Sequence, residues 1–351
     1  MGKPILSREI ESEREPLPIM SIIVPIHNEV GNLENLYRRI VLVTEANSIP
    51  FELILIDDGS KDGSREVQRK LAEQDYRVKA VHLSRNFGHQ IALTAGLDFS
   101  SGRVLVMMDG DLQHPPELIP ELISRWEQGF DVVNTRREST EGVGIFKRMS
   151  SASFYWLINK ISEVPIIPGA ADFRLIDRKV ANALRDIRER NRFIRGLVNW
   201  TGYRSSEIVY RAPARCKGHS SYSFKKMARF ALDGVTSFST LPLQVCSLIG
   251  LVVSVLSALY GLEAIYSKLI SHQTVEGWTS VIVAVLFLGG VQLLSLGVLG
   301  LYIGRVYTEA KARPLYLVEE TLTSPGPKSL ELHQRSIRTA GLAEVVLSNQ
   351  H

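Results

Sequence analysis

The chain has 351 residues, of which 45% are hydrophobic and 22% charged, and its formal net charge is +4. That length has room for one α/β domain of about 200 residues and for a further region. The basic residues form no basic motif with interleaved aromatic residues. We therefore expect contacts with anionic lipid headgroups and phosphate groups, and no nucleic-acid partner. The two cysteines, Cys216 and Cys246, fit no metal-binding spacing.

Residues 1–17 are charged, lack an apolar export segment and are predicted to form a solvated tail. An alternation of apolar strand patterns and helical patterns follows. Strands are expected over residues 19–25, 51–56, 78–83 and 104–108, and helices over 31–46, 64–73 and 88–99. This alternation is typical of a doubly wound, mostly parallel sheet. The sequence therefore predicts an α/β domain over residues 18–221.

Two apolar segments follow this domain, at residues 242–265 and 281–303, and the second contains no charged residue. Each is long enough to cross a hydrocarbon core of about 30 Å, which takes about 20 helical residues. We predict a membrane hairpin over residues 241–307. The stretch 222–240 combines basic and phenylalanine side chains and is predicted to form an amphipathic helix on the membrane surface.

The loop between the apolar segments has only about fifteen residues, so the two segments must run antiparallel. Basic residues flank the hairpin on its outer sides: Lys225, Lys226 and Arg229 before it, and Arg305, Lys311 and Arg313 after it. The positive-inside rule then places both termini in the cytoplasm. We predict a protein of the inner (cytoplasmic) membrane with two spans and a cytoplasmic C-terminal segment over residues 308–351. From about residue 321 this segment is polar, carries no recognisable motif and is expected to be partly disordered.

Polar side chains follow each of the four predicted strands. They are His27, Asn28 and Glu29 after the first strand, Asp57 and Asp58 after the second, Arg85 and Asn86 after the third, and Asp109 and Asp111 after the fourth. Ligands of doubly wound sheets bind outside the carboxyl ends of the strands. No G-x-G-x-x-G sequence follows the first strand and the chain has no P-loop, so neither a dinucleotide cofactor nor a P-loop nucleotide is indicated.

Asp109 and Asp111 are separated by one residue, and the carboxamide of Gln113 follows two residues later. Oxygen ligands at this spacing suit Mg2+ or Mn2+, and such an ion neutralises a nucleotide diphosphate. An EF-hand is excluded because its turn glycine would fall on His114. Asp57 and Asp58 are expected to accept hydrogen bonds from a base or from ribose hydroxyls.

In these residues the chain resembles glycosyltransferases of the GT-A type, in the large inverting family that contains dolichyl-phosphate mannose synthase. The resemblance rests on residues 24–29 (VPIHNE), 57–64 (DDGSKDGS), 109–117 (DGDLQHPPE) and 172–175 (DFRL). Residues 302–314 (YIGRVYTEAKARP) are similar to the bacterial two-span members, the bactoprenol (undecaprenyl-phosphate) glucosyltransferases. The similarity extends from about residue 20 to about residue 318.

The resemblance implies a role for individual residues. Nucleotide binding is expected at Pro25, His27, Glu29 and Asp57, with Asp58 and Arg85 added from the strand ends. Metal binding is expected at Asp109, Asp111 and Gln113, and catalysis at Asp109, Asp111 and Asp172. Phosphate or acceptor binding is expected at Arg136, Arg148, Arg215 and Ser220. The chain departs from the family pattern at His27, where the family commonly has an aromatic residue, and at Cys216 and Ser221 in the loop expected to close over the donor.

Asp172 is expected mainly to orient the acceptor or a nearby arginine, because an acceptor phosphate with a second pKa of about 6 needs no strong base. A role as general base is the lesser alternative. Arg188 and Arg190 are expected on a solvated helix face, paired with Asp186 and Glu189. Arg192 and Arg195 are expected to face a lipid phosphate. The Arg-Trp pair typical of processive polysaccharide synthases is missing, since Gly196 follows Arg195.

The resemblance thus implies inverting transfer of one sugar, glucose from UDP-glucose, to a polyprenyl phosphate at the cytoplasmic membrane face. GDP-mannose, UDP-galactose or an aminoarabinose derivative stay open as donors, as does the choice between Mg2+ and Mn2+. A non-enzymatic regulator that binds a nucleotide sugar is the alternative from another class. A flippase and a homo-oligomer formed through the apolar segments are kept as partner hypotheses, the latter on the small-xxx-small spacing of Gly300 and Gly304.

Overall fold

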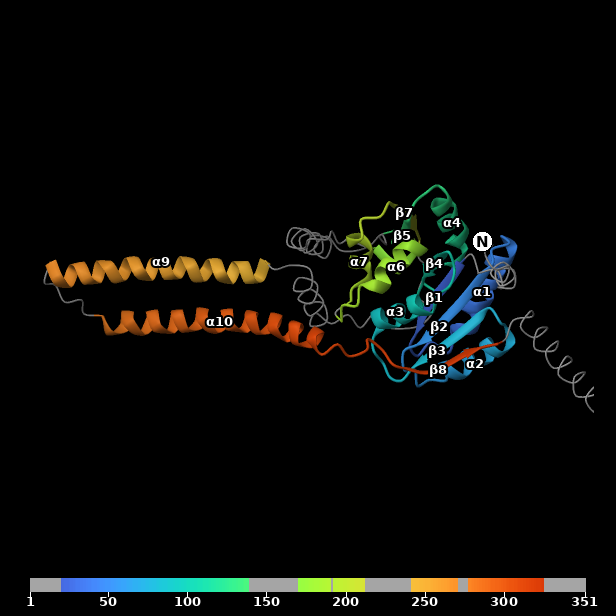
Figure 1. Ribbon diagram of the computed structural model, residues 1–351, viewed down its shortest axis with the longest axis horizontal. Coiled ribbons are helices and arrows are strands. Elements are labelled where there is room, and N and C mark those ends of the chain that lie inside the picture. Colours follow the sequence, from blue (N-terminus) through green and yellow to red (C-terminus); the bar gives the residue numbers. More distant parts are fainter. Residues whose placement is uncertain (1–19, 139–169, 191, 212–240, 271–276, 325–351) are drawn as a thin grey trace, which may run out of the picture.

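The computed structural model describes residues 20–138, 170–190, 192–211, 241–270 and 277–324. Within these residues a sheet of eight strands has the order β7-β5-β6-β4-β1-β2-β3-β8, and two long helices project from the sheet domain (Figure 1). The strands are β1 (Met20–Ile26), β2 (Phe51–Asp57), β3 (Val78–Leu83), β4 (Val104–Met107), β5 (Val132–Arg137), β6 (Ala170–Asp177), β7 (Ser205–Tyr210) and β8 (Val318–Thr323).

The helices that belong to the sheet domain cover both of its faces. They are α1 (Leu33–Ala46), α2 (Ser64–Gln74), α3 (His89–Phe99), the 3-10 helix η2 (Pro116–Leu118), α4 (Ile119–Glu127), α6 (Arg178–Asp186) and α7 (Ile194–Trp200). Helices α1, α2 and α4 share one apolar cluster with the sheet, and α3, α6 and α7 share the other. The four predicted strands and the three helices between them are confirmed, with ends that differ by at most two residues.

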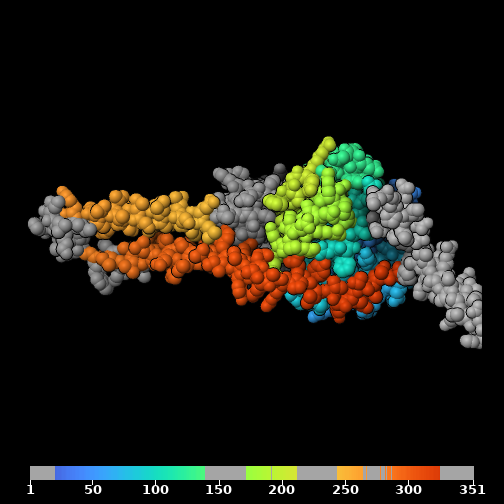
Figure 2. Space-filling model, in the orientation of Figure 1, coloured from blue at the N-terminus to red at the C-terminus, as the bar shows by residue number. Residues whose placement is uncertain are grey.

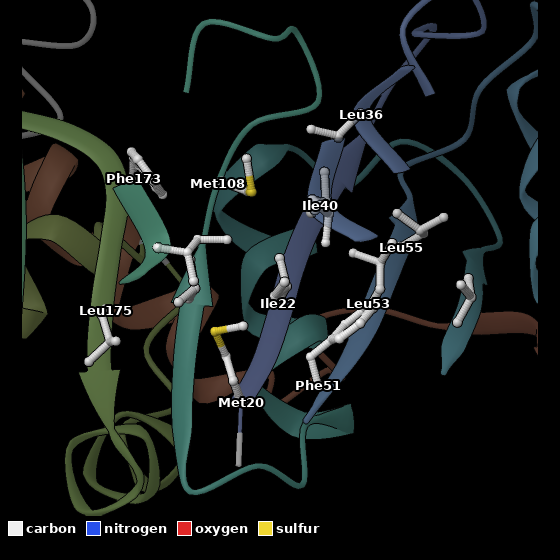
Figure 3. Close-up of a cluster of buried hydrophobic side chains, with 14 of the residues drawn as sticks. Met20, Ile22, Leu36, Ile40, Phe51, Leu53, Leu55, Met108, Phe173 and Leu175 are labelled. Carbon is white, nitrogen blue, oxygen red and sulfur yellow. The ribbon is translucent and has the colours of Figure 1, made fainter. Parts of the chain in front are cut away.

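The centre of the sheet is buried on both sides. All seven residues of β1 are buried, and because successive side chains of a strand point to opposite faces, Ile22 packs into the α1 side while Ile23 packs into the α3 side. Figure 3 shows Met20 and Ile22 of β1 beside Leu53 and Leu55 of β2, within the first cluster. This double burial explains why the strands read as continuous apolar runs.

The sheet is mixed, although mostly parallel at its centre. Strands β4, β1, β2 and β3 are parallel neighbours. Strand β6 runs antiparallel between β4 and β5, and β7 pairs in parallel with β5 at the edge. The insertion of β6 beside β4 matters for function, because it brings the beginning of β6 next to the end of β4.

The chain that follows the apolar helices returns to the sheet. Strand β8 pairs antiparallel with β3, from Lys79 opposite Thr323 to Leu83 opposite Val318. The hydroxyl of Tyr316 donates to Asp98 at 2.8 Å, just ahead of this strand. Residues 321–323 of the segment expected to be partly disordered belong to β8, and residues 325–351 lie outside the described residues.

Helices α9 (Leu241–Ile270) and α10 (Trp278–Ala310) contact each other and extend away from the sheet domain (Figures 1 and 2). Segments Leu243–Glu263 and Val283–Ala310 have mean hydropathies of 2.2 and 2.1. Both are long and apolar enough to cross a membrane, so they are candidate spans; they overlap the predicted segments 242–265 and 281–303, and the second continues beyond residue 303. The predicted amphipathic helix over residues 222–240 lies outside the described residues.

Candidate active site

A cavity of about 290 Å3 lies at the carboxyl ends of the central strands. Its lining comes from the segments that follow β1, β2, β3 and β4: Pro25, Ile26, His27, Glu29, Asp58, Asn86, Gly88, His89, Asp109, Gly110 and Asp111. Of the residues singled out from the sequence, Pro25, His27, Glu29, Asp58, Asp109 and Asp111 meet here.

One wall of the cavity is formed by the segments after β2 and β3, which Asp58 joins. Its carboxylate is 3% exposed and accepts from the backbone N–H groups of Phe87, at 2.6 Å, and Gly88, at 2.9 Å. The carbonyl oxygen of Asp58 accepts from Nδ1 of His27 at 2.8 Å, which requires the Nδ1-protonated tautomer. The His27 ring is thereby held at the cavity by a backbone contact rather than by stacking.

Asp57 and Arg85 lie just outside the cavity lining. Asp57 is fully buried, and its Oδ2 accepts from the N–H groups of Gly59 and Ser60, both at 3.1 Å. The guanidinium carbon of Arg85 lies 4.0 Å from the centroid of the Phe87 ring. The structure thus places Asp57 as the residue that shapes the turn after β2, and Arg85 on the aromatic residue beside the wall.

The opposite wall carries Asp109 and Asp111, directly after β4. The N–H of Asp109 donates to Nδ1 of His114 at 2.9 Å, and the His114 ring stacks on Phe173 with centroids 5.3 Å apart. Asp111 accepts from the N–H of Gln113 at 3.0 Å. Burial raises the pKa of Asp109, and its Oδ1 has no hydrogen-bond partner among the described residues. This enclosed carboxylate oxygen is therefore suited to a cation.

His89 bridges two carboxylates from different strands. Its Nε2 lies 3.5 Å from Oδ1 of Asp109 and 3.5 Å from Oδ2 of Asp172. Burial alone would lower the pKa of His89, but the hydrogen bond with Asp172 and the negative charge of Asp109 raise it above its ordinary value. Sequence reasoning missed His89. Its position as the first residue of α3, directly after the polar end of β3, is the signal that could have found it.

Asp172 at the beginning of β6 lies among cationic groups. Nη2 of Arg195 is 3.1 Å and Nη2 of Arg174 is 3.6 Å from its Oδ1. Burial would raise the pKa of Asp172, but His89 and the two guanidinium groups hold it well below its usual range. Arg174 is 1% exposed, and its burial lowers the pKa of that group to about 10. Asp172 is thus an ionised group that orients Arg195.

Two predicted ligands point elsewhere. Oε1 of Gln113 accepts from Arg137 at 3.2 Å, and Gln113 is not part of the cavity lining. The Nε of Arg136 donates to Glu207 at 3.1 Å, so it is the neighbouring arginine that reaches the turn after β4. Within the described ranges no group of three or more His, Cys, Asp or Glu side chains is arranged to hold a metal ion. The predicted Arg148, Arg215 and Ser220 lie outside those ranges.

The arginines between α6 and α7 do not all lie as expected. Arg192 is 5% exposed and donates to the carbonyl oxygens of Leu184 and Ile187, so the expectation that it faces a lipid phosphate is wrong. Arg188 forms the expected exposed ion pair, but its partner is Asp98 at 2.8 Å. The N–H of Arg190 donates to Glu309 of α10 at 2.7 Å. The contact of Arg190 with Glu309 joins the α6–α7 connection to the end of α10.

Comparison with known proteins gives three findings. The family model "Glycosyl transferase family 2" matches residues 21–185. A glycosyltransferase of Synechocystis sp. is 44% identical over 301 residues, which are 86% of this chain and 95% of that protein. The SfII prophage-derived bactoprenol glucosyl transferase of Shigella flexneri is 40% identical over 302 residues, covering 86% of this chain and 98% of that protein.

Among solved structures, the similarity is weaker. The glucosyl-3-phosphoglycerate synthase of Mycobacterium tuberculosis, in complex with Mn2+, uridine-diphosphate-glucose and phosphoglyceric acid, is 18% identical with a TM-score of 0.42. The match covers 63% of this chain and 79% of that one.

Proposed function

Because the chain belongs to glycosyl transferase family 2, we propose that it transfers one glucose from UDP-glucose to the phosphate of a polyprenyl lipid, undecaprenyl phosphate, at the cytoplasmic face of the membrane. The observation that carries the proposal is the cavity in which the paired carboxylates Asp109 and Asp111 face the wall held by Asp58. The relative in Shigella flexneri, by its name a bactoprenol glucosyl transferase, supports the choice of sugar and lipid.

The wall built from His27, Asp58 and Asn86 is the proposed seat of the nucleoside. This wall offers two groups to the nucleoside: the His27 ring, which is fixed by a hydrogen bond to the backbone, and the amide group of Asn86. The Asp58 carboxylate is occupied by two backbone N–H groups, so its main contribution is to fix the wall rather than to bind the base. A preformed wall of this kind lowers the ordering cost of binding.

A divalent cation, Mg2+ or Mn2+, fits the opposite wall. Asp109 supplies an enclosed oxygen without a hydrogen-bond partner in the described part of the chain, and Asp111 lines the same cavity. Two carboxylates are sufficient protein ligands, because Mg2+ is commonly held by one or two carboxylates together with substrate phosphates and water. Bound there, the ion would neutralise the charge of the leaving diphosphate. Gln113 would support the site through its N–H bond to Asp111.

The acceptor phosphate is proposed to approach at Arg195. Asp172 holds this guanidinium at the edge of the site and, being ionised, keeps it in one orientation. A phosphate with a second pKa of about 6 is already largely ionised at neutral pH, so its own oxygen is the nucleophile and needs no strong base. A single displacement at the anomeric carbon would invert its configuration.

The pairing of β8 with β3 supports the proposed membrane topology. The segment after α10 lies in the same sheet as the segment before α9, so both belong on one side of a membrane. Candidate spans at α9 and α10 then form a hairpin that crosses twice. The basic residues around this hairpin favour the cytoplasm as the side of the sheet domain and both termini.

Transfer of radiolabel to undecaprenyl phosphate by the detergent-purified chain tests the proposal. UDP-glucose, UDP-galactose and GDP-mannose are offered in parallel with Mg2+ or Mn2+, and the Asp111→Asn variant is the control. We expect labelled lipid from UDP-glucose, abolished by a chelator and by the variant. Labelled lipid from UDP-galactose or GDP-mannose alone would show that the transferred sugar is the sugar of that donor and not glucose. Nucleotide binding without transfer from any donor would favour a nucleotide-sugar-binding regulator.

A further inference from the structure

We propose that Arg65 on α2 is a positioning residue for the donor cavity, and that strand β8 holds it in place through Glu319. The inference rests on the proposed function in one respect, that a nucleotide occupies the cavity. It adds a role for the chain segment after the apolar helices, which lies on the far edge of β3 and does not line the cavity.

The guanidinium group of Arg65 binds three strand ends at once. Its Nε donates to Oδ2 of Asp57, at the end of β2, at 2.8 Å. Its Nη2 donates to the carbonyl oxygen of Leu83, at the end of β3, at 2.7 Å. Its Nη1 donates to Oε2 of Glu319 on β8 at 2.9 Å. One planar group therefore sets the spacing of β2, β3 and β8 at the rim of the sheet.

Two of these contacts continue into the cavity wall. Oδ2 of Asp57 also accepts from the N–H groups of Gly59 and Ser60, so the same oxygen fixes the turn after β2. Leu83 ends the strand that leads to Asn86, and a Cβ built on Gly59 would lie only 2.5 Å from the backbone nitrogen of Asn86. The turn and the Asn86 segment are thus packed tightly, with Arg65 directly behind them.

Differences in burial make the ion pair of Arg65 with Asp57 the stronger of the two and the ion pair of Arg65 with Glu319 the weaker. The side chain of Asp57 is 0% exposed, that of Arg65 21% and that of Glu319 54%. Charges within a low-dielectric interior attract more strongly than charges in water, so the pair of Arg65 with Asp57 dominates. Glu319 completes the hydrogen bonding of the guanidinium group and limits its rotation. Lysine cannot replace this arrangement, since its single nitrogen cannot span three separated acceptors.

Arg69 provides a matched control on the same helix and strand. It lies one turn further along α2 and forms an ion pair at 2.7 Å with Glu320, the neighbour of Glu319 on β8. Its hydrogen bond goes to β8 rather than to Asp57 or Leu83. Arg69 therefore ties α2 to β8 without reaching the turns that form the cavity wall.

The test compares Arg65→Lys with Arg69→Lys in the full, detergent-purified chain. Isothermal titration with UDP, and in parallel with GDP, in Mn2+ gives the affinity, and thermal melting reports the fold. We expect Arg65→Lys to weaken binding of the preferred nucleotide about tenfold, the size of losing one hydrogen bond to a charged group. The donor KM should rise while the acceptor KM stays unchanged. Arg69→Lys should keep the wild-type affinity at a similar melting temperature.

Glu319→Gln, compared with Glu320→Gln, tests the contribution of β8 with less risk to folding. Removal of a negative charge should by itself favour an anionic nucleotide, whereas loss of positioning should weaken its binding. We expect Glu319→Gln to weaken nucleotide binding about twofold to threefold relative to Glu320→Gln, in keeping with an exposed ion pair. Equal affinities in these two variants would overturn the role of β8.

The failure of this inference differs from the failure of the proposed function. If the wild-type chain binds UDP or GDP and Arg65→Lys binds it equally well, the positioning role is overturned and the proposed function stands. If Arg65→Lys and Arg69→Lys lose affinity and melting temperature to the same extent, Arg65 is only structural. A wild-type chain that binds neither nucleotide would overturn the proposed function itself.

Discussion

Asp172 on β6 and Arg195 on α7 form an ion pair at the edge of the cavity, with Oδ1 and Nη2 3.1 Å apart. The pair joins an element of the sheet to a helix on one face, and His89 links the same carboxylate to Asp109. The acceptor side and the metal side of the proposed site are therefore connected through one charged network. Changes at Asp172 should affect how the acceptor is oriented more than how the nucleotide is bound.

The first prediction concerns Asp172→Asn. Loss of the negative charge releases Arg195 and leaves the buried Arg174 without this anionic neighbour. We expect kcat for transfer to fall about 100-fold, the effect of a misplaced reacting group, with little change in UDP affinity. Initial rates at a saturating donor concentration measure this fall in kcat. Asp98→Asn is the matched control, because Asp98 is also 17% exposed and paired with an arginine. Loss of UDP affinity in Asp172→Asn would contradict the acceptor-side role.

The second prediction concerns the dependence of activity on pH. The pKa of Asp172 is held below its usual range, so the stability and order that its ion pairs contribute are complete above about pH 4 and are lost only as pH falls through the lowered pKa. Between pH 5 and 8 the acidic limb of the rate profile should then follow the acceptor phosphate, near its second pKa of about 6, and not Asp172. His89 and Asp109, whose pKa values are raised, are present in the wild-type chain and in the variant alike. The residual activity of Asp172→Asn should show the same limb. Its disappearance would assign a base role to Asp172.

The third prediction concerns the cost of burying Asp109. Its pKa is raised by burial, so the charged form destabilises the fold, and stability decreases as pH rises from the ordinary pKa of about 4 through the raised value. Asp109→Asn should abolish transfer and yet raise the apparent Tm at pH 8, because the neutral amide removes the ionised form that burial disfavours. The gain should vanish near pH 4. The same Tm difference between Asp109→Asn and the wild-type chain at pH 4 and at pH 8 would contradict this prediction.

Strands β1 to β4 and the helices between them could be predicted because their residues are buried on both faces and read as apolar runs bounded by polar ends. The family and the α/β class of the GT-A type are confirmed. Strand β8 could not be predicted in the same way. Its sequence, VEETLT, has no buried side chain, and it pairs with β3 through backbone hydrogen bonds and carboxylate contacts to α2.

The contacts across the site depend on tertiary arrangement. Asp172 reaches His89 only because β6 is inserted beside β4. The hydrophobic periodicity of the sequence does not indicate that β4 and β6 are neighbours. Arg137 rather than Arg136 reaches the turn after β4, and this depends on which face of β5 each residue occupies. The pairing of β5 with β6 shifts register between Asn134 and Arg136, and a shift of one residue reverses the face. The sequence therefore located the carboxylates correctly at the strand ends, but not the side chains that orient them.

The last prediction concerns Gly59, where the turn after β2 meets the segment after β3. Gly59 has φ +70°, and an added Cβ would lie 2.5 Å from the backbone nitrogen of Asn86 and 2.8 Å from the backbone carbon of Arg85. Backbone atoms cannot move aside as a flexible side chain can, so Gly59→Ala must push the two segments apart. We expect it to weaken nucleotide binding at least tenfold and to lower the apparent Tm, since strain at such a position costs of order 1–3 kcal/mol. Titration with UDP and thermal melting measure both effects.

Gly31→Ala is the control for that variant. Gly31 also lies in a loop after a central strand, but a Cβ there would meet no atom within 4 Å and its φ is not in the left-handed region. Gly31→Ala should therefore keep the UDP affinity and melting temperature of the wild-type chain. If Gly59→Ala binds UDP as tightly as Gly31→Ala does, the close approach of the two segments does not shape the nucleotide site, and the proposed route from Arg65 through Asp57 to Asn86 loses its final step.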